Sequence, residues 1–177
     1  MTRGPQAPAP HPTRLVASRP AHVAIEEYLP AAVACVKFLR GLFPGAVPDD
    51  IQIRREVVRL YTWVAELFSR TQIRFYVISG ALDLIMRLEV CDFPALPPHE
   101  LLTVACMLAH KYLEDTTYRI EAWSTAGQDM VPKDRVVQLE KAMLECLEWD
   151  VNFDFRSLRE IGRRVFGNLC VGNECFF

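Results

Sequence analysis

The chain has 177 residues, of which 51% are hydrophobic and 24% are charged, and its formal net charge is −2. These values are typical of one globular domain with an ordinary core and some additional tail, and the slight negative charge argues against a broad surface for nucleic acid. The cysteines show no CxxC spacing and the first residues lack the apolar segment of a secretory signal, so we expect a reducing compartment, the nucleus or the cytoplasm.

The N-terminal part of the chain divides into a tail and a helix. Residues 1–20 contain many prolines and little to bury, a composition that does not offset the entropy lost on ordering, and we expect a disordered tail. Over residues 22–43 apolar side chains recur at helical spacing, which predicts an amphipathic helix. Pro30 falls inside this pattern and is expected either to kink the helix or to mark the start of its longer part.

Two further amphipathic patterns precede the most apolar part of the chain. The first covers about residues 50–69, after a turn at 44–50, and the second covers residues 75–88. Asp83 lies among apolar residues of the second pattern and needs a partner if it is buried. Residues 91–98, with the sequence CDFPALPP, are expected to form a loop.

The run LLTVACMLAHKYL, residues 101–113, is apolar nearly all round apart from Thr103, His110 and Lys111. A helix of this kind has to be surrounded by other helices or by lipid. At about 1.5 Å per residue the run spans only about 20 Å, which is too short for a bilayer. We therefore expect a central buried helix over about Pro98–Glu114 in a helical bundle, with Lys111 emerging near its end and no membrane partner.

The C-terminal part of the chain continues the helical pattern. The predicted elements are a short helix at 119–125, a helix from Pro132 through Trp149, a short helix at 155–166 and an irregular tail at 167–177. No segment alternates convincingly with the period of a strand. The predicted fold class is therefore all-α, a bundle of about six helices over residues 21–166.

No arrangement of residues in the sequence indicates a catalytic centre. The motifs HExxH, GxSxG, Walker A and GxGxxG are absent. Cys106 and His110 lie four residues apart on one face of the central helix, with Glu114 a turn further on, but a zinc site needs two more ligands and none has suitable spacing. We therefore expect a protein that acts by binding, with no metal, no cofactor and no small-molecule substrate.

Residues 75–151 resemble a cyclin box, and the segments that carry the resemblance come in that family's order. ALDLIM at 81–86 is similar to the second-helix signature, LLTVACMLAHKYLEDTTY at 101–118 to the third, and EAWSTAG and then QLEKAMLECLEWDV at 138–151 to the fourth and fifth. The details resemble the fungal Pcl-type cyclins, which activate the cyclin-dependent kinase of the phosphate-response system. The resemblance implies a single cyclin-box bundle with an extra N-terminal helix.

Cyclins hold their kinase through a lysine on the third helix and a glutamate on the fifth, and the matching residues here are Lys111 and Glu140. An ammonium can donate to backbone carbonyls, and a carboxylate can accept from backbone N–H groups. The positions that pack on the regulatory helix of the kinase match Tyr112, Leu144, Trp149 and Val151. The resemblance thus implies a regulatory subunit, not an enzyme, whose partner is the catalytic subunit of a cyclin-dependent protein kinase in the cell cycle or in the nutrient and phosphate response.

The sequence departs from the family pattern in two places. Leu84 follows Asp83 where many cyclins have an arginine. The first-helix patch that recruits substrates in cell-cycle cyclins reads RREVVRLYTW here, and alignment on Trp63 places Glu56 and Arg59 at apolar positions. These charges argue against hydrophobic docking of substrate motifs at this surface.

Two other classes of function are compatible with parts of this pattern. A cyclin-fold adaptor or transcription-related module would have the same fold without activating a kinase, because fold does not fix function. A helical enzyme or metal protein is disfavoured by the absent motifs. Solvated helix faces are the simpler explanation of two arginine clusters, at 54, 55 and 59 and at 159, 163 and 164, and we expect no nucleic-acid partner.

Overall fold

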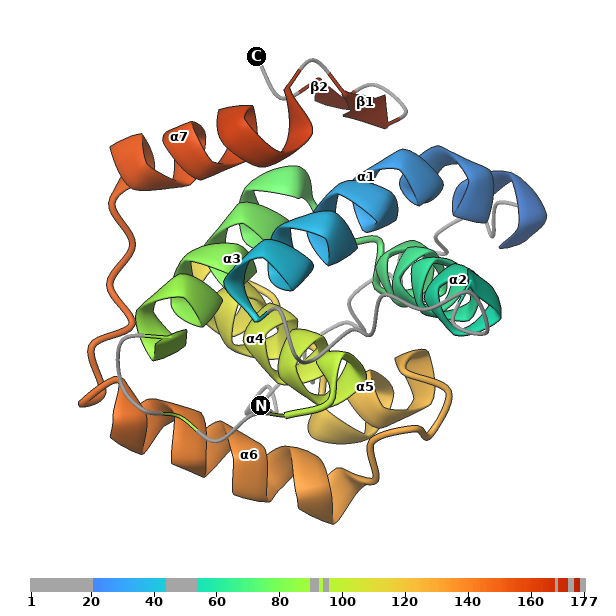
Figure 1. Cartoon of the computed structure of the whole chain (residues 1–177). Coiled ribbons are helices and arrows are strands. Elements are labelled where there is room, and N and C mark those ends of the chain that lie inside the picture. The colour runs from blue at the N-terminus through green and yellow to red at the C-terminus, as the bar shows by residue number, and fades with distance from the viewer. Residues whose placement is uncertain are drawn as a thin grey trace, which may run out of the picture.

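Helix α4, Pro98–Leu113, lies at the centre of the molecule, and its ten residues from Leu101 to His110 are all buried. The computed structural model describes residues 21–43, 54–89, 93, 96–167, 169–171 and 174–175, and it places helices on both sides of α4 (Figure 1). Pro98 begins α4 at a position where proline costs no helical hydrogen bond. The helix ends because Glu114 is extended, and the Glu114 N–H donates to the His110 carbonyl at 3.1 Å.

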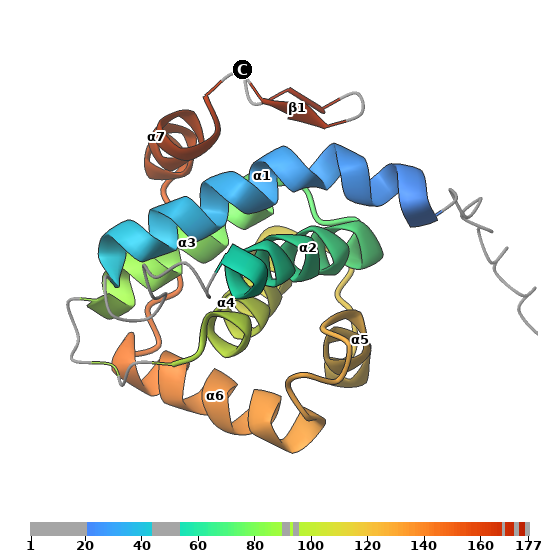
Figure 2. The same cartoon turned by 45° about the vertical axis from the view of Figure 1, so that its right-hand side comes forward.

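The other described helices surround α4. In chain order they are α1 (Ala21–Leu42), α2 (Arg54–Thr71), α3 (Phe75–Glu89), α5 (Ile120–Ala126), α6 (Lys133–Cys146) and α7 (Phe155–Phe166). α3 packs along α4, α1 packs along α2, and α7 covers α3 and contacts α1, whereas α5 and α6 lie on the opposite side of α4 (Figures 1 and 2). None of these described helices combines the length and the apolar character needed to span a membrane.

The structure confirms the predicted all-α bundle with a central buried helix and a further helix at its N-terminal end. The bounds of α3, α4 and α7 agree with the prediction to within one residue, because an apolar face at helical spacing, or for α4 a continuous apolar run, is a strong local signal. α1 runs through Pro30 and does not begin there. The tail at 1–20, the turn at 44–50 and half of the loop at 91–98 lie outside the described residues.

The prediction of an irregular tail at 167–177 needs a correction. Cys170–Val171 (β1) and Glu174–Cys175 (β2) form a short antiparallel ladder, in which Cys170 lies opposite Cys175 and Val171 opposite Glu174. A strand of two residues is too short for the alternation of apolar and polar side chains to be recognised in the sequence.

Hydrogen bonds from buried aromatic side chains connect the elements across long sequence separations. The Trp63 indole Nε1 on α2 donates to the Gly127 carbonyl at 3.1 Å, beyond the end of α5. The Tyr28 hydroxyl on α1 donates to the Ile73 carbonyl at 3.2 Å, in the connection between α2 and α3. Each ring therefore contributes apolar area to the core while its polar atom is satisfied by main chain.

α3 and α4 approach each other closely at Gly80. A Cβ atom at this position would lie 2.8 Å from Leu113 Cδ1, 3.3 Å from the Ala109 Cβ and 3.2 Å from Phe153 Cε1. These distances are shorter than ordinary van der Waals contact between carbon atoms. A larger residue would displace the side chains of Leu113 and Phe153 and press against Ala109, on the last turns of α4 that lead to Lys111.

We expect Gly80→Val to lower the free energy of unfolding by about 1–3 kcal/mol, because extra atoms in a close-packed contact displace their neighbours. The matched control is Gly41→Val on α1, where nothing lies within 4 Å of an added Cβ. The control should change the free energy of unfolding by less than about 0.5 kcal/mol. Urea denaturation of both variants measures the difference, and equal losses would show that space at Gly80 is not limiting.

Candidate functional site

Lys111 and Glu140 form an ion pair between the last turn of α4 and the middle of α6. Lys111 Nζ lies 2.5 Å from Glu140 Oε1, and the two side chains are 28% and 18% exposed. Lys111 directly follows the ten buried residues of α4, so it is the point at which that helix emerges from the core. The structure therefore brings together the two charged residues that the resemblance to cyclins singled out.

The four apolar residues of the predicted site divide into two exposed and two buried side chains. Tyr112 is 53% exposed and Trp149 is 62% exposed. Leu144 and Val151 are buried and belong to the hydrophobic core. In this structure the two aromatic side chains can offer contact area to a partner, whereas Leu144 and Val151 support the chain that carries them.

The exposed position of Trp149 follows from a turn after α6. Glu148 and Trp149 both have left-handed backbones, with φ of 52° and 62°. The Trp149 N–H donates to the Leu144 carbonyl at 2.8 Å, and the Asp150 N–H donates to the Leu147 carbonyl at 2.9 Å. The prediction that this helix continues through Trp149 is therefore wrong. Left-handed φ is uncommon for large side chains, so surrounding contacts have to hold the turn.

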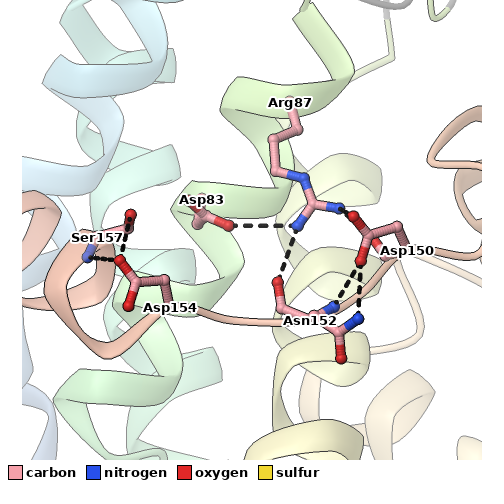
Figure 3. A network of polar contacts seen from close by, with 6 residues as sticks. All are labelled: Asp83, Arg87, Asp150, Asn152, Asp154 and Ser157. Carbon is pink, nitrogen blue, oxygen red and sulfur yellow. Dashed lines mark hydrogen bonds and ion pairs between the residues drawn. The ribbon is translucent and has the colours of Figure 1, made fainter.

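Arg87 on α3 connects this turn to a partly buried carboxylate (Figure 3). Its Nη1 lies 3.6 Å from Asp83 Oδ2 and donates to the Asn152 carbonyl at 3.3 Å, while its Nη2 donates to the Asp150 carbonyl. Asp83 thus has the partner that its apolar surroundings require. Burial raises the pKa of Asp83, and the charge of Arg87 acts in the opposite direction. Sequence reasoning missed the contacts to residues 150 and 152, because 63 and 65 positions separate them from Arg87.

The model of one protein family, the cyclin N-terminal domain, matches residues 48–152. This chain belongs to the cyclin family. The cyclin match covers more than half of the chain and includes both members of the ion pair, whereas α1 and α7 lie outside it. Cyclins are regulatory subunits rather than enzymes, and they typically bind cyclin-dependent kinases. No curated protein and no solved structure matches the chain significantly.

The cyclin match begins at residue 48, whereas the sequence resemblance described above begins at residue 75. The match therefore includes the helix that carries Trp63. Beside Trp63 lies an open groove of about 510 Å³, between α2, the start of α4 and the turn after α5. The exposed side chains of Val58 and Met130 give it apolar surface, and Glu56 and Arg59 also line it. A groove is thus present at this surface of the cyclin box, and it is lined by Glu56 and Arg59, the two charged residues that the alignment on Trp63 placed at apolar positions.

The possible metal ligands Cys106, His110 and Glu114 do not form a site. Cys106 is completely buried, and burial raises the pKa of its thiol to about 12, so the thiol stays protonated. Glu114 accepts a hydrogen bond from the Tyr76 hydroxyl at 2.5 Å and lies 3.7 Å from Arg74 Nε. Within the described part of the chain, no group of three or more His, Cys, Asp or Glu side chains could hold a metal ion.

His110 is buried at the same end of α4 as Lys111. Its ring lies against those of Tyr118 and Trp123, with centroids 5.0 and 5.6 Å away. It also borders a cavity of about 230 Å³ that Glu114 helps to line. Burial lowers the pKa of His110 below the ordinary 6.5, and the nearby charge of Glu114 acts in the opposite direction.

Because the pKa of His110 is lower in the folded chain, the unfolded chain binds more protons below about pH 6.5. We therefore expect the free energy of unfolding to fall as the pH is lowered from about 7 to about 5. His110→Gln removes this titration, so its free energy of unfolding should fall less over the same range. Urea denaturation at a series of pH values measures both slopes, and identical slopes would contradict the prediction. His99, whose pKa burial also lowers, should keep part of the dependence in the variant.

Proposed function

We propose that this chain is the regulatory subunit of a cyclin-dependent protein serine/threonine kinase, which it binds and activates. The observation that carries the proposal is the partly exposed ion pair between Lys111 and Glu140 in the cyclin box. One exposed aromatic residue lies beside Lys111 on α4, and another follows the end of α6. Those residues are Tyr112 and Trp149. Large aromatic side chains are typical of the positions that dominate binding energy at protein interfaces.

The ion pair keeps bonding capacity for a partner. A lysine ammonium has three N–H donors, and a carboxylate has two oxygens with about four acceptor sites. The contact between Lys111 and Glu140 uses one N–H group and Oε1. The remaining donors and acceptors can bind carbonyl and N–H groups in the main chain of a kinase, while each side chain holds the other in place. Such bonds are stronger at a partly buried site than in bulk water.

The packing of α4 supports a mechanism of activation without chemistry by this chain. Lys111 and Tyr112 stand on a helix that is anchored by ten buried residues, so their backbone positions are held by the core. A surface held in this way binds one conformation of a flexible partner better than another. Tighter binding to the active position of the kinase's regulatory helix shifts the kinase toward that state.

We also propose a partner of the kind used by the fungal Pcl-type cyclins, in the cell cycle or the nutrient and phosphate response, in the nucleus or the cytoplasm. The support is the sequence AHKYLED at 109–115 and LECLEWD at 144–150. These two segments contain Lys111 and Trp149, two of the residues that we propose contact the kinase.

Affinity capture of the full chain, followed by mass spectrometry and kinase assays with a purified panel of cyclin-dependent kinases, tests the proposal. We expect at least one such kinase to bind and to phosphorylate its substrate faster in the presence of the chain. Binding without stimulation would favour a cyclin-fold adaptor. Failure to bind any kinase of the panel would contradict the proposal.

Lys111→Ala and Glu140→Ala should each weaken kinase binding by at least about tenfold, because each leaves a charge at the interface without its partner. The melting temperature should change little, since ion pairs that keep access to solvent contribute little to stability. Isothermal titration calorimetry and thermal denaturation measure the two effects. A large loss of stability would show instead that the pair serves the fold.

A second ion pair provides the matched control. Lys133 Nζ also lies 2.5 Å from a carboxylate, Glu121 Oε1, and these side chains are 53% and 57% exposed. Lys133→Ala and Glu121→Ala should leave kinase binding within about twofold of the unaltered chain. Equal losses for both pairs would mean that the kinase responds to overall charge and not to the pair formed by Lys111 and Glu140.

A further inference from the structure

Arg87 lies outside the set of residues that the cyclin resemblance assigns to kinase binding, yet it contacts the turn that presents Trp149. Its side chain extends from α3 and donates to the carbonyls of Asp150 and Asn152, on either side of Val151 (Figure 3). A planar guanidinium can engage two acceptors at once with fixed geometry, which a lysine ammonium does not do. The contact therefore restrains the direction of the chain directly after Trp149.

The segment after Trp149 depends on such contacts. Residues 150–154 belong to no helix or strand, and they follow two left-handed residues. Asp150 Oδ1 accepts from the Asn152 N–H at 3.2 Å and from the Asn152 Nδ2 at 3.1 Å. The side chain of Asp150 thus closes the segment on itself, and Arg87 attaches this closed segment to α3.

Asp83 keeps the guanidinium of Arg87 in place. It lies one helical turn before Arg87 on α3, 3.6 Å from Nη1, and its side chain is 17% exposed. Val77, Ile78 and the other buried residues of α3 hold that helix against the core. The cation that reaches the turn is therefore fixed to a rigid element rather than to another loop.

We propose that Arg87 is a positioning residue for partner binding, which acts by holding the main chain of residues 150–152 so that the side chain of Trp149 is presented in one direction. The inference rests on the proposed kinase binding for its functional consequence. Its mechanical part, the restraint on Trp149, can be tested in the free chain.

Fluorescence of the free chain provides the first test. The chain has three tryptophans, and Trp63 and Trp123 are buried, so acrylamide quenching selects the signal of Trp149. Arg87→Met should lower the anisotropy of the quenchable signal, because the turn gains freedom. Arg87→Lys keeps the charge opposite Asp83 and should give an intermediate value, which also guards against a variant that fails to fold. Unchanged anisotropy in both variants would overturn the proposal.

A double-mutant cycle on kinase binding provides the second test. Arg87→Met should weaken binding about tenfold in the unaltered chain, and less than about twofold in a chain that already carries Trp149→Ala. A merely structural role of Arg87 would weaken binding equally in both chains, and that result would overturn the proposal. If the unaltered chain binds no kinase, the proposed function fails, whereas the anisotropy measurement still decides whether Arg87 holds the turn.

Arg70 offers a matched control for both tests. It too pairs with a carboxylate one helical turn away, since its Nη2 lies 3.7 Å from Glu66 Oε2. Its Nη1 also donates to a distant carbonyl, that of Thr125, at 3.3 Å. Arg70→Met should leave the anisotropy of Trp149 unchanged and kinase binding within about twofold. Equal effects of Arg70→Met and Arg87→Met would assign the changes to general loosening of the fold and overturn the proposal.

Discussion

The burial of α4 on all sides is the constraint on which the rest of the structure depends. Ten consecutive buried residues require neighbours all round the helix, and α2, α3, α5 and α6 all contact it. Lys111 is the first residue after this buried run, so the packing of the run fixes the position of its backbone. A side chain at such an edge is held by packing on one side and meets solvent on the other, which is the condition for a defined and accessible binding group.

The candidate binding face combines elements of different rigidity. Lys111 and Tyr112 are on the last turn of α4, and Glu140 is in the middle of α6, so all three stand on regular helix. Trp149 stands on a turn, whose conformation is not fixed by a repeating pattern of hydrogen bonds. A contact from a neighbouring helix can replace that pattern. The polar network around Arg87 supplies such a contact, and it joins α3 to the segment that follows Trp149.

Local pattern predicted most of the fold, and the family resemblance singled out Lys111 and Glu140, which form an ion pair in the structure. Helices α3 and α7 were predictable because apolar side chains recur at helical spacing within one short segment. Helix α4 was predictable for another reason, because an apolar run of this length that cannot span a bilayer has to be a buried helix. The turn at Glu148 and Trp149 was not, because neither residue is a glycine or an asparagine that would signal left-handed backbone. The sequence also did not show that Leu144 and Val151 are buried while Trp149 is exposed. Which of these side chains face the core depends on where the helix ends, and the turn sets that end. The contact of Arg87 with residues 150 and 152 depends on tertiary structure alone.

Two helices outside the region that matches the family model complete the core. The ring of Phe166 on α7 lies 5.7 Å from that of Phe75, and the ring of Tyr28 on α1 lies 6.2 Å from that of Phe68. Phe68 and Phe75 both belong to the matched region and are buried. Without α1 and α7 these rings would lose apolar cover and meet water. In this protein the packed core therefore extends beyond the region that matches the family model, and the boundaries of the two should not be taken as the same.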